Sequence, residues 1–202
     1  MRLLVLGATG NTGVEVVKQA LQRGHTVKVL VRSPEKVPSQ AGLQVVKGNV
    51  LKAAEVRAQL DDVDAVITSV GPNDLKPTTV YSDSGRAIVE AMRGSMVKRL
   101  AVVSVATRFP PAGLLVRVVQ FILRHGVKDA RVLEQVVRDS GLEWTILRPP
   151  RLTNAAARGT FREEVDALPK GGEKIARADL AAALLDVVEK KQFVQQMAGV
   201  CY

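Results

Sequence analysis

Three glycines near the start of the chain stand in a run of small and polar residues, Gly7-Ala8-Thr9-Gly10-Asn11-Thr12-Gly13. An apolar run, Leu3 to Leu6, precedes it. A helical pattern follows it, with Val14, Val17 and Leu21 on one face. A strand, a glycine-rich turn and a helix in this order are typical of a site that binds phosphate groups with the unpaired N–H groups of the helix start. We therefore predict that this turn holds the pyrophosphate of a dinucleotide.

Each glycine has a separate expected task. Gly7 makes the sharp turn, Gly10 allows the backbone to approach the pyrophosphate, and Gly13 lets the helix lie close against the strand. We also expect Thr9, Asn11 and Thr12, which lie between these glycines, to contact the cofactor. The alternative is a glycine-rich turn that serves packing alone, because the spacing is G-x-x-G-x-x-G and not the commoner G-x-G-x-x-G.

A cation follows the second apolar run, Thr26 to Val31, at the position where an acidic residue would bind the ribose hydroxyls of NAD. This cation is Arg32, with Ser33 and Lys36 close behind it. A guanidinium can grip a 2′-phosphate through two parallel hydrogen bonds, whereas a carboxylate would repel it. The pattern favours NADP as the cofactor. The alternative is a surface arginine at the end of a strand.

Two more strand ends supply expected cofactor contacts. Asn49 and Val50 follow the predicted strand Gln44 to Lys47 and would flank the adenine. Val70 and Gly71 end the predicted strand Asp64 to Val70, where the absence of a side chain at Gly71 lets the backbone pass beside the cofactor. For Asn49, a turn asparagine that bonds its own backbone is an equally good interpretation.

Ser104 lies at the end of the predicted strand Arg99 to Val105. Ligands of doubly wound sheets gather at the carboxyl ends of the strands, so this hydroxyl is a candidate catalytic group that contacts nicotinamide or substrate. No histidine or other base stands beside it in the sequence, so nucleophilic catalysis has no support. The alternative is a buried serine with a structural hydrogen bond.

The segment Pro149-Pro150-Arg151-Leu152 follows the predicted strand Glu143 to Leu147, which carries Trp144 as a core residue. Prolines cannot donate ladder hydrogen bonds, so the pair directs the chain over the edge of the cofactor. We expect Pro149, Pro150 and Leu152 to line the cofactor site. Arg151 is the second candidate catalytic residue, as a contact for an anionic substrate, or else a rim charge.

The order of these patterns predicts one α/β domain over residues 1–202, a Rossmann fold with a doubly wound, mainly parallel sheet of strand order 3-2-1-4-5-6 and a small C-terminal extension. We expect the apolar segment Leu114 to Leu123, after the breaker-rich loop Phe109 to Gly113, to serve as core or as a lid. The expected helices are Ala53–Leu60, Thr78–Arg93, Val127–Ser140 and Asp179–Lys190, and the expected short strands are Gly159–Arg162, Glu173–Ala176 and Met197–Cys201.

Composition excludes several other classes of protein. The 202 residues carry a net charge of +9, which suggests anionic ligands. Only 3% of the residues are aromatic, so side chains that could stack on nucleobases are scarce. We therefore do not expect a nucleic acid as a partner. A single cysteine, Cys201, rules out a disulfide within the chain and suits a reducing cytoplasm. No zinc-ligand spacing, secretory signal or apolar run of the roughly 20 residues needed for a membrane span is visible.

The glycine turn, the segment Val29 to Arg32 and the proline pair together resemble the atypical short-chain dehydrogenase/reductase superfamily, in its NmrA-like branch. Two further stretches are similar to the NADPH-dependent flavin reductases of the biliverdin reductase B type: Gly48-Asn49-Val50-Leu51-Lys52-Ala53-Ala54-Glu55-Val56 and Asn73-Asp74-Leu75-Lys76-Pro77-Thr78-Thr79-Val80. The resemblance covers nearly the whole chain. It implies a protein that passes hydride from NADPH to a flavin or a linear tetrapyrrole.

The chain also departs from the pattern of that family. The family usually has Asp where Asn49 stands, a threonine-serine pair where this chain has Ser104-Val105, and histidine at the place of Arg151. The Tyr-x-x-x-Lys pair of ordinary short-chain dehydrogenases is absent, since Lys128 has Arg124 four residues before it. The last departure disfavours alcohol oxidation through a tyrosine.

Reduction of a flavin needs little acid–base help, because the isoalloxazine ring is already an electron sink and water can supply the proton. We therefore expect an NADPH-dependent reductase with a small-molecule substrate such as a flavin, tetrapyrrole or quinone, acting as a monomer or weak homodimer. The alternative is a regulator that senses NADP(H) without turnover.

Overall fold

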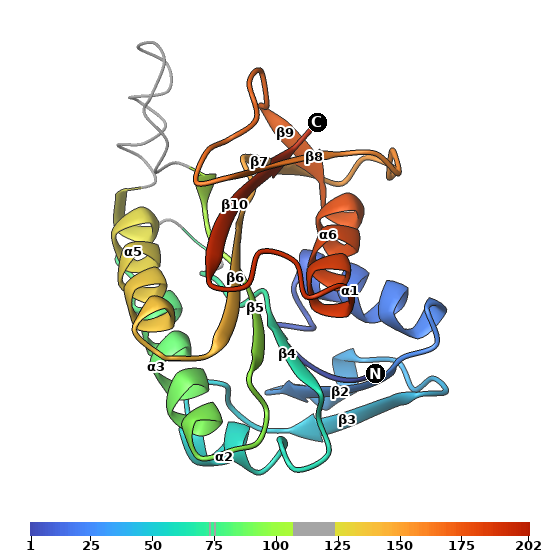
Figure 1. Cartoon of the computed structure of the whole chain (residues 1–202). Helices are drawn as coiled ribbons and strands as arrows, with labels where there is room; N and C mark the ends of the chain where they lie inside the picture. Colours follow the sequence, from blue (N-terminus) through green and yellow to red (C-terminus); the bar gives the residue numbers. More distant parts are fainter. Residues whose placement is uncertain (73, 75, 107–123) are drawn as a thin grey trace.

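A computed structural model of the chain describes residues 1–72, 74, 76–106 and 124–202. It forms a central sheet with helices on both faces (Figure 1). The expected loop Phe109 to Gly113 and the apolar segment Leu114 to Leu123 lie outside the described residues.

The main sheet has eight strands in the order β3-β2-β1-β4-β5-β6-β10-β8. All neighbouring pairs are parallel except β10 with β8. This confirms the predicted order over the first six strands, and two C-terminal strands extend the sheet beyond β6. The bounds, in sheet order, are Leu43–Lys47 (β3), Thr26–Val31 (β2), Arg2–Leu6 (β1), Ala65–Thr68 (β4), Arg99–Val103 (β5), Glu143–Arg148 (β6), Gln196–Cys201 (β10) and Arg162–Val165 (β8).

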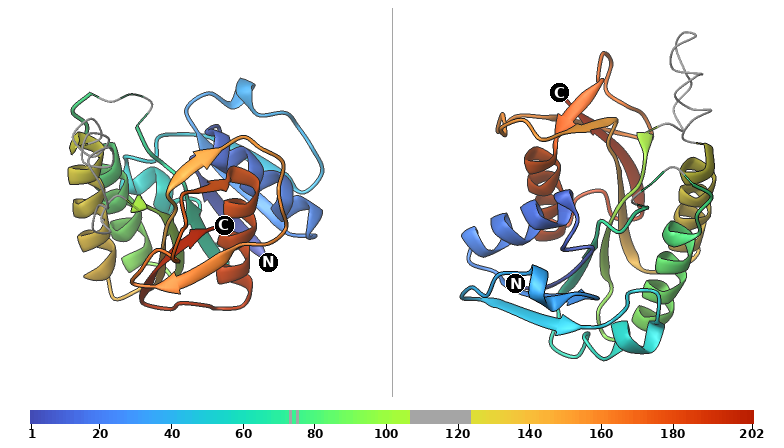
Figure 2. Two further views of the ribbon diagram at one scale, coloured as in Figure 1. Left: turned by 90° about the horizontal axis from the view of Figure 1, so that it is seen from above. Right: turned by 180° about the vertical axis from the view of Figure 1, so that it is seen from behind.

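The helices divide between the two faces of this sheet, as the views in Figures 1 and 2 show. Helices α1 (Asn11–Gln22) and α6 (Arg177–Glu189) pack together on one face. Helices α2 (Ala53–Arg57), α3 (Val80–Arg93) and α5 (Arg124–Arg138) cover the other. Buried apolar side chains form one cluster on each side of the sheet, which is the arrangement expected for strands that are buried on both faces. A short 3₁₀ turn, η1 (Pro34–Lys36), follows β2.

Three local expectations were wrong. Val14 is 51% exposed, whereas Val17 is buried as expected. Helix α1 buries Val16 and Ala20 beside Val17, because its close approach to β1 at Gly13 turns that face inward. Helix α2 ends at Arg57, three residues before the expected Leu60. The strand expected at Gly159–Arg162 begins only at Arg162, where β8 pairs with β10.

The strand expected at Glu173–Ala176 forms as β9 (Lys174–Ala176) and pairs with β7 (Arg151–Thr153), a strand the sequence did not indicate.

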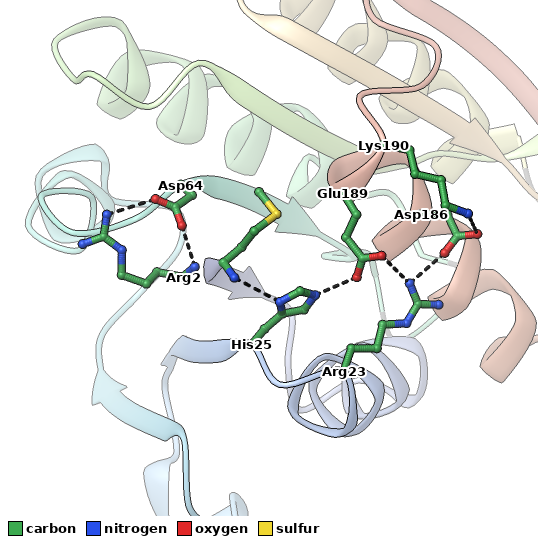
Figure 3. Close-up of polar contacts among 8 residues, drawn as sticks. Arg2, Arg23, His25, Asp64, Asp186, Glu189 and Lys190 are labelled. Atoms are coloured by element: carbon green, nitrogen blue, oxygen red, sulfur yellow. Dashed lines mark hydrogen bonds and ion pairs between the residues drawn. The ribbon is translucent and has the colours of Figure 1, made fainter.

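An ionic network ties the C-terminal ends of α1 and α6 together (Figure 3). Arg23 donates to Asp186 at 2.7 Å and to Glu189 at 2.9 Å, and His25 contacts Glu189 at 2.6 Å. Burial raises the pKa of Asp186, but hydrogen bonds from Lys190 and Arg23 outweigh it, and the net shift is downward. In the same view Arg2 pairs with Asp64 at the start of β1. These contacts lie at the amino ends of the strands, away from the predicted site.

Candidate functional site

The glycine turn joins β1 to α1 as the sequence predicts. Gly7 has a φ of +83°, which favours glycine, and the Gly10 N–H donates to the Gly7 carbonyl at 3.0 Å. A Cβ at Gly13 would lie only 2.1 Å from the Gly7 carbonyl oxygen, so a side chain there would push α1 away from the turn. Gly13 therefore sets the distance between helix and strand. No side chain of a described residue caps the N-terminus of α1, so its first N–H groups are available to an anion.

Two hollows adjoin this turn along the carboxyl ends of the strands, and they meet at Gly10 and the segment Ser69–Pro72. The first has a volume of about 470 Å³ and the second about 420 Å³. Among the predicted site residues, the first is lined by Gly7, Thr9, Gly10, Arg32, Ser33, Lys36, Asn49, Val50, Val70 and Gly71. The second is lined by Gly10, Asn11, Thr12, Val70, Gly71, Ser104, Pro149, Pro150 and Leu152. The structure thus brings together every predicted site residue except Gly13, which shapes the turn, and Arg151.

The cations at the far end of the first hollow follow β2. Arg32 and Lys36 are exposed, and neither side chain has a hydrogen bond or ion pair with a described residue. Ser33 lies between them and starts η1. The pair can therefore reach an anion in the hollow without giving up an existing contact.

Asn49 makes the turn that the alternative interpretation describes. Its side-chain oxygen accepts from the Leu51 N–H at 3.1 Å, and its own N–H donates to Glu55 at 2.7 Å. The hydrogen bond from Lys52, and then the one from the Asn49 N–H, hold the pKa of Glu55 below its usual value. Asn49 and Val50 nevertheless line the first hollow, so one turn both stabilises the loop after β3 and forms a wall of the site.

Ser104 is only 2% exposed, and its hydroxyl donates to Glu134 of α5 at 2.7 Å. The carboxylate of Glu134 also accepts two hydrogen bonds from Arg148, each 2.8 Å long. The sequence did not single out Glu134, because it lies 30 residues from Ser104 and only the packing of α5 brings it there. The hydroxyl proton of Ser104 is therefore engaged within the protein, which leaves its lone pairs for the second hollow.

Arg151 begins β7, is exposed and lines neither hollow, whereas Arg177 lines the second. Arg177 is the first residue of α6, is half-buried, and donates to Asn154 at 2.6 Å. The sequence reasoning missed Arg177, since it lies more than 20 residues after the proline pair. Its place at the start of a helix directly after a buried strand was the one available signal.

Tyr81 of α3 is a second residue that sequence reasoning missed, and it also lines the second hollow. The wall between the hollows contains Ser69, whose hydroxyl is buried and has no hydrogen-bond partner among the described residues. The described residues include no cluster of His, Cys, Asp and Glu that could hold a metal ion. Within the same residues, no helix has both the length and the apolar character required to cross a membrane.

These features fit a nicotinamide dinucleotide. The glycine turn leaves room for a pyrophosphate against the start of α1, and unengaged cations lie where the adenosine end would be. The fold and this cleft define a nucleotide-binding protein of the Rossmann class, with the ligand site at the carboxyl ends of the strands.

The chain belongs to a family described as NAD(P)H-binding, whose model matches residues 7–191. The photosystem II assembly factor Ycf39 of Synechocystis is 29% identical over 155 residues, which are 73% of this chain and 44% of that protein. The protein YwnB of Bacillus subtilis is 26% identical over 94% of this chain and 92% of its own length. A (4-alkanoyl-5-oxo-2,5-dihydrofuran-3-yl)methyl phosphate reductase of Streptomyces griseus is 34% identical over 73% of this chain and 46% of its own. The chain thus spans less than half of two of these relatives.

Solved structures share the fold at low sequence identity. The oxidoreductase ylbE from Lactococcus lactis superposes with a TM-score of 0.84 at 19% identity, covering all of this chain and 90% of its own. A short-chain dehydrogenase/reductase from Veillonella parvula, in complex with NADP, has a TM-score of 0.83 at 18% identity, covering all of this chain and 94% of its own. A candidate NADH-flavin reductase from Streptococcus pneumoniae has a TM-score of 0.79 at 21% identity, covering all of this chain and 99% of its own. The chain is therefore an NAD(P)H-binding family member with a Rossmann fold.

Proposed function

We propose that this protein is an NADPH-dependent reductase that transfers hydride to a conjugated small-molecule acceptor. The observation that carries the proposal is the pair of hollows meeting at Gly10 and Ser69–Pro72. The glycine turn, Arg32 and Lys36 line the first hollow, which suits the pyrophosphate and adenosine parts of a dinucleotide, so the nicotinamide would lie in the second. The second hollow has further space beside Pro149, Pro150 and Leu152 for an apolar acceptor ring.

The choice of NADP rests on Arg32 and Lys36. Both are exposed at the end of the first hollow, where the adenosine ribose of a bound dinucleotide would lie, and no acidic side chain lines that hollow. A 2′-phosphate would replace water around two cations that have no ion pair with a described residue. A charge-assisted, two-point contact of this kind contributes about 1.5–3 kcal/mol.

The acceptor class rests on the residues of the second hollow. Arg177 would bind an anionic group of the acceptor, which is the role the sequence suggested for Arg151. Flavin mononucleotide and linear tetrapyrroles carry such groups, and the Streptomyces relative is named for a phosphate-bearing, conjugated substrate. Bound NADPH would supply the hydride, while the protein aligns the two rings and excludes water between them.

Two measurements test this proposal. Purified protein mixed with NADPH and flavin mononucleotide should oxidise NADPH faster than the same mixture without protein. Absence of turnover with flavin mononucleotide, biliverdin and a quinone, despite tight NADPH binding, would instead support a sensor that does not turn over its cofactor.

The cofactor preference has its own test by calorimetry. Arg32→Asp should raise the Kd for NADPH about 100-fold, equivalent to roughly 3 kcal/mol, and change the Kd for NADH little. Arg93→Asp is the matched control, since it changes the net charge by the same amount at an exposed residue outside the lining of the first hollow. Arg93 is the last residue of α3, whereas the first residue of that helix, Val80, lines the hollow. Equal losses for both nucleotides in Arg32→Asp would contradict the assignment of the 2′-phosphate.

A further inference from the structure

Tyr81 places a phenol at the junction of the two hollows. Its ring lies against Gly71, where an added Cβ would be 3.0 Å from the hydroxyl oxygen and 3.2 Å from Cζ. The absence of a side chain at Gly71 is thus what gives the phenol its place. The apolar part of the ring packs on the cluster beneath α3 and α5, so the side chain has a fixed base.

The backbone of Tyr81 is fixed from the neighbouring helix. Asp129 of α5 is 6% exposed, and its carboxylate accepts from the Tyr81 N–H at 2.8 Å and from the Ser82 N–H at 3.2 Å. These N–H groups belong to the first turn of α3 and would otherwise be unpaired. Asp129 therefore serves as a cap supplied by another helix, and it holds the start of α3 beside the hollow.

The hydroxyl of Tyr81 has no hydrogen bond with a described residue, although the side chain is half-buried and lines the second hollow. Burial raises the pKa of this phenol, and the negative charge of Asp129 adds to the shift. The group is therefore protonated at neutral pH and can donate to a ligand.

Two other polar groups on this wall, those of Ser104 and Arg177, are poor proton donors. The Ser104 proton is already donated to Glu134 at 2.7 Å. Arg177 offers a guanidinium, a group that binds anions and is not a general acid. Tyr81 combines an unengaged phenolic O–H with a position on the second hollow. The Ser69 hydroxyl also has no partner among the described residues, but it is buried and an aliphatic alcohol is a much weaker acid than a phenol.

We propose that Tyr81 is the catalytic proton donor for a conjugated carbonyl acceptor such as a quinone or an enone. The inference rests on the proposed reductase function and narrows its substrate class. As hydride from NADPH bonds to the acceptor, an electron pair moves onto the carbonyl oxygen. That oxygen takes the proton from Tyr81, the phenolic O–H bond breaks, and the phenolate regains a proton from water. Each turnover consumes one NADPH and one proton.

The test compares acceptors on one variant, Tyr81→Phe, which keeps the ring and removes only the hydroxyl. General acid catalysis contributes about 10²–10⁴-fold, so kcat with menadione and with 2-cyclohexen-1-one should fall at least about 100-fold. Reduction of flavin mononucleotide, for which water supplies the proton, should fall by a much smaller factor than reduction of the two carbonyl acceptors. The melting temperature and the Kd for NADPH should stay the same, since the lost hydroxyl has no partner among the described residues. Tyr81→Met should repeat the loss with the carbonyl acceptors.

The remaining outcomes separate this inference from the reductase proposal. Wild-type protein that reduces flavin but neither carbonyl acceptor overturns the role of Tyr81 and leaves the reductase in place. Equal activity of Tyr81→Phe and wild type with the carbonyl acceptors does the same, as does an equal loss on all three acceptors with a lowered melting temperature. Wild-type protein that reduces none of the acceptors overturns both proposals.

Discussion

Substitution of Gly13 by alanine tests the physical basis of the nucleotide site. The new Cβ would lie 2.1 Å from the Gly7 carbonyl oxygen, 2.7 Å from the Gly7 carbonyl carbon and 2.8 Å from the Ala8 Cα. All three atoms belong to the backbone of the turn, so no side chain can rotate out of the way. An ordinary contact needs at least 3.4 Å, so the closest separation must grow by about 1.3 Å. Helix α1 has to move away from β1 by a comparable amount.

The expected loss of stability is at the upper end of the range for overpacked cores, about 3 kcal/mol. For a chain of this size such a change lowers the melting temperature by roughly 6–12 °C. Because the same movement carries the first N–H groups of α1 away from the turn, NADPH affinity should fall as well. Thermal unfolding and calorimetric titration with NADPH measure the two effects.

Gly126→Ala is the matched control, because an added Cβ at Gly126 in α5 meets no atom within 4 Å. Alanine is the better helix former by about 1 kcal/mol, so this variant should be as stable as wild type or more stable. If Gly13→Ala matched wild type in both melting temperature and NADPH affinity, the close approach at the turn would not be what sets the position of α1.

The remaining predictions concern stability. Arg99 is 4% exposed and donates to the Val187 and Gln192 carbonyls at 2.6 and 3.0 Å, so Arg99→Met should lower the free energy of unfolding by about 3 kcal/mol in urea titrations, and an unchanged midpoint would contradict this. Asp186 has a folded-state pKa below its ordinary value, so its carboxylate stabilises the fold above about pH 4 and that contribution is lost as the pH falls further. Asp186→Asn should therefore be less stable than wild type at pH 7 and closer to it at pH 3, and a constant difference would rule out the ionic contribution.

Local patterns were enough to predict most of the fold. Each parallel strand is an apolar run bounded by turn residues, and the glycine turn places the first helix directly after β1. Those signals act over a few residues, so the order of the first six strands and most of the residues that line the two hollows followed from them. The cytoplasmic location and the monomer or weak-homodimer state stay predictions.

Local patterns failed where a contact joins distant segments. Helix α5 brings Glu134 to Ser104 and Asp129 to the start of α3, and the residues next to either carboxylate in the sequence do not predict these contacts. The pairing of β7 with β9 draws Arg151 to the surface and leaves Arg177 at the hollow. An alternation of apolar residues says which face of an element is buried, but not which element will cover it.

The sequence by itself determined the class of ligand, because a glycine turn between a strand and a helix, followed by a cation after the second strand, can be read without knowing any long-range contact. Only the tertiary structure decided which groups line the second hollow. Tyr81, Ser104 and Arg177 line one hollow because helices pack against the sheet around it, and they lie too far apart in the sequence for a local pattern to predict this. Contacts between side chains of distant segments depend on how the whole core packs, so no short stretch of sequence predicts them.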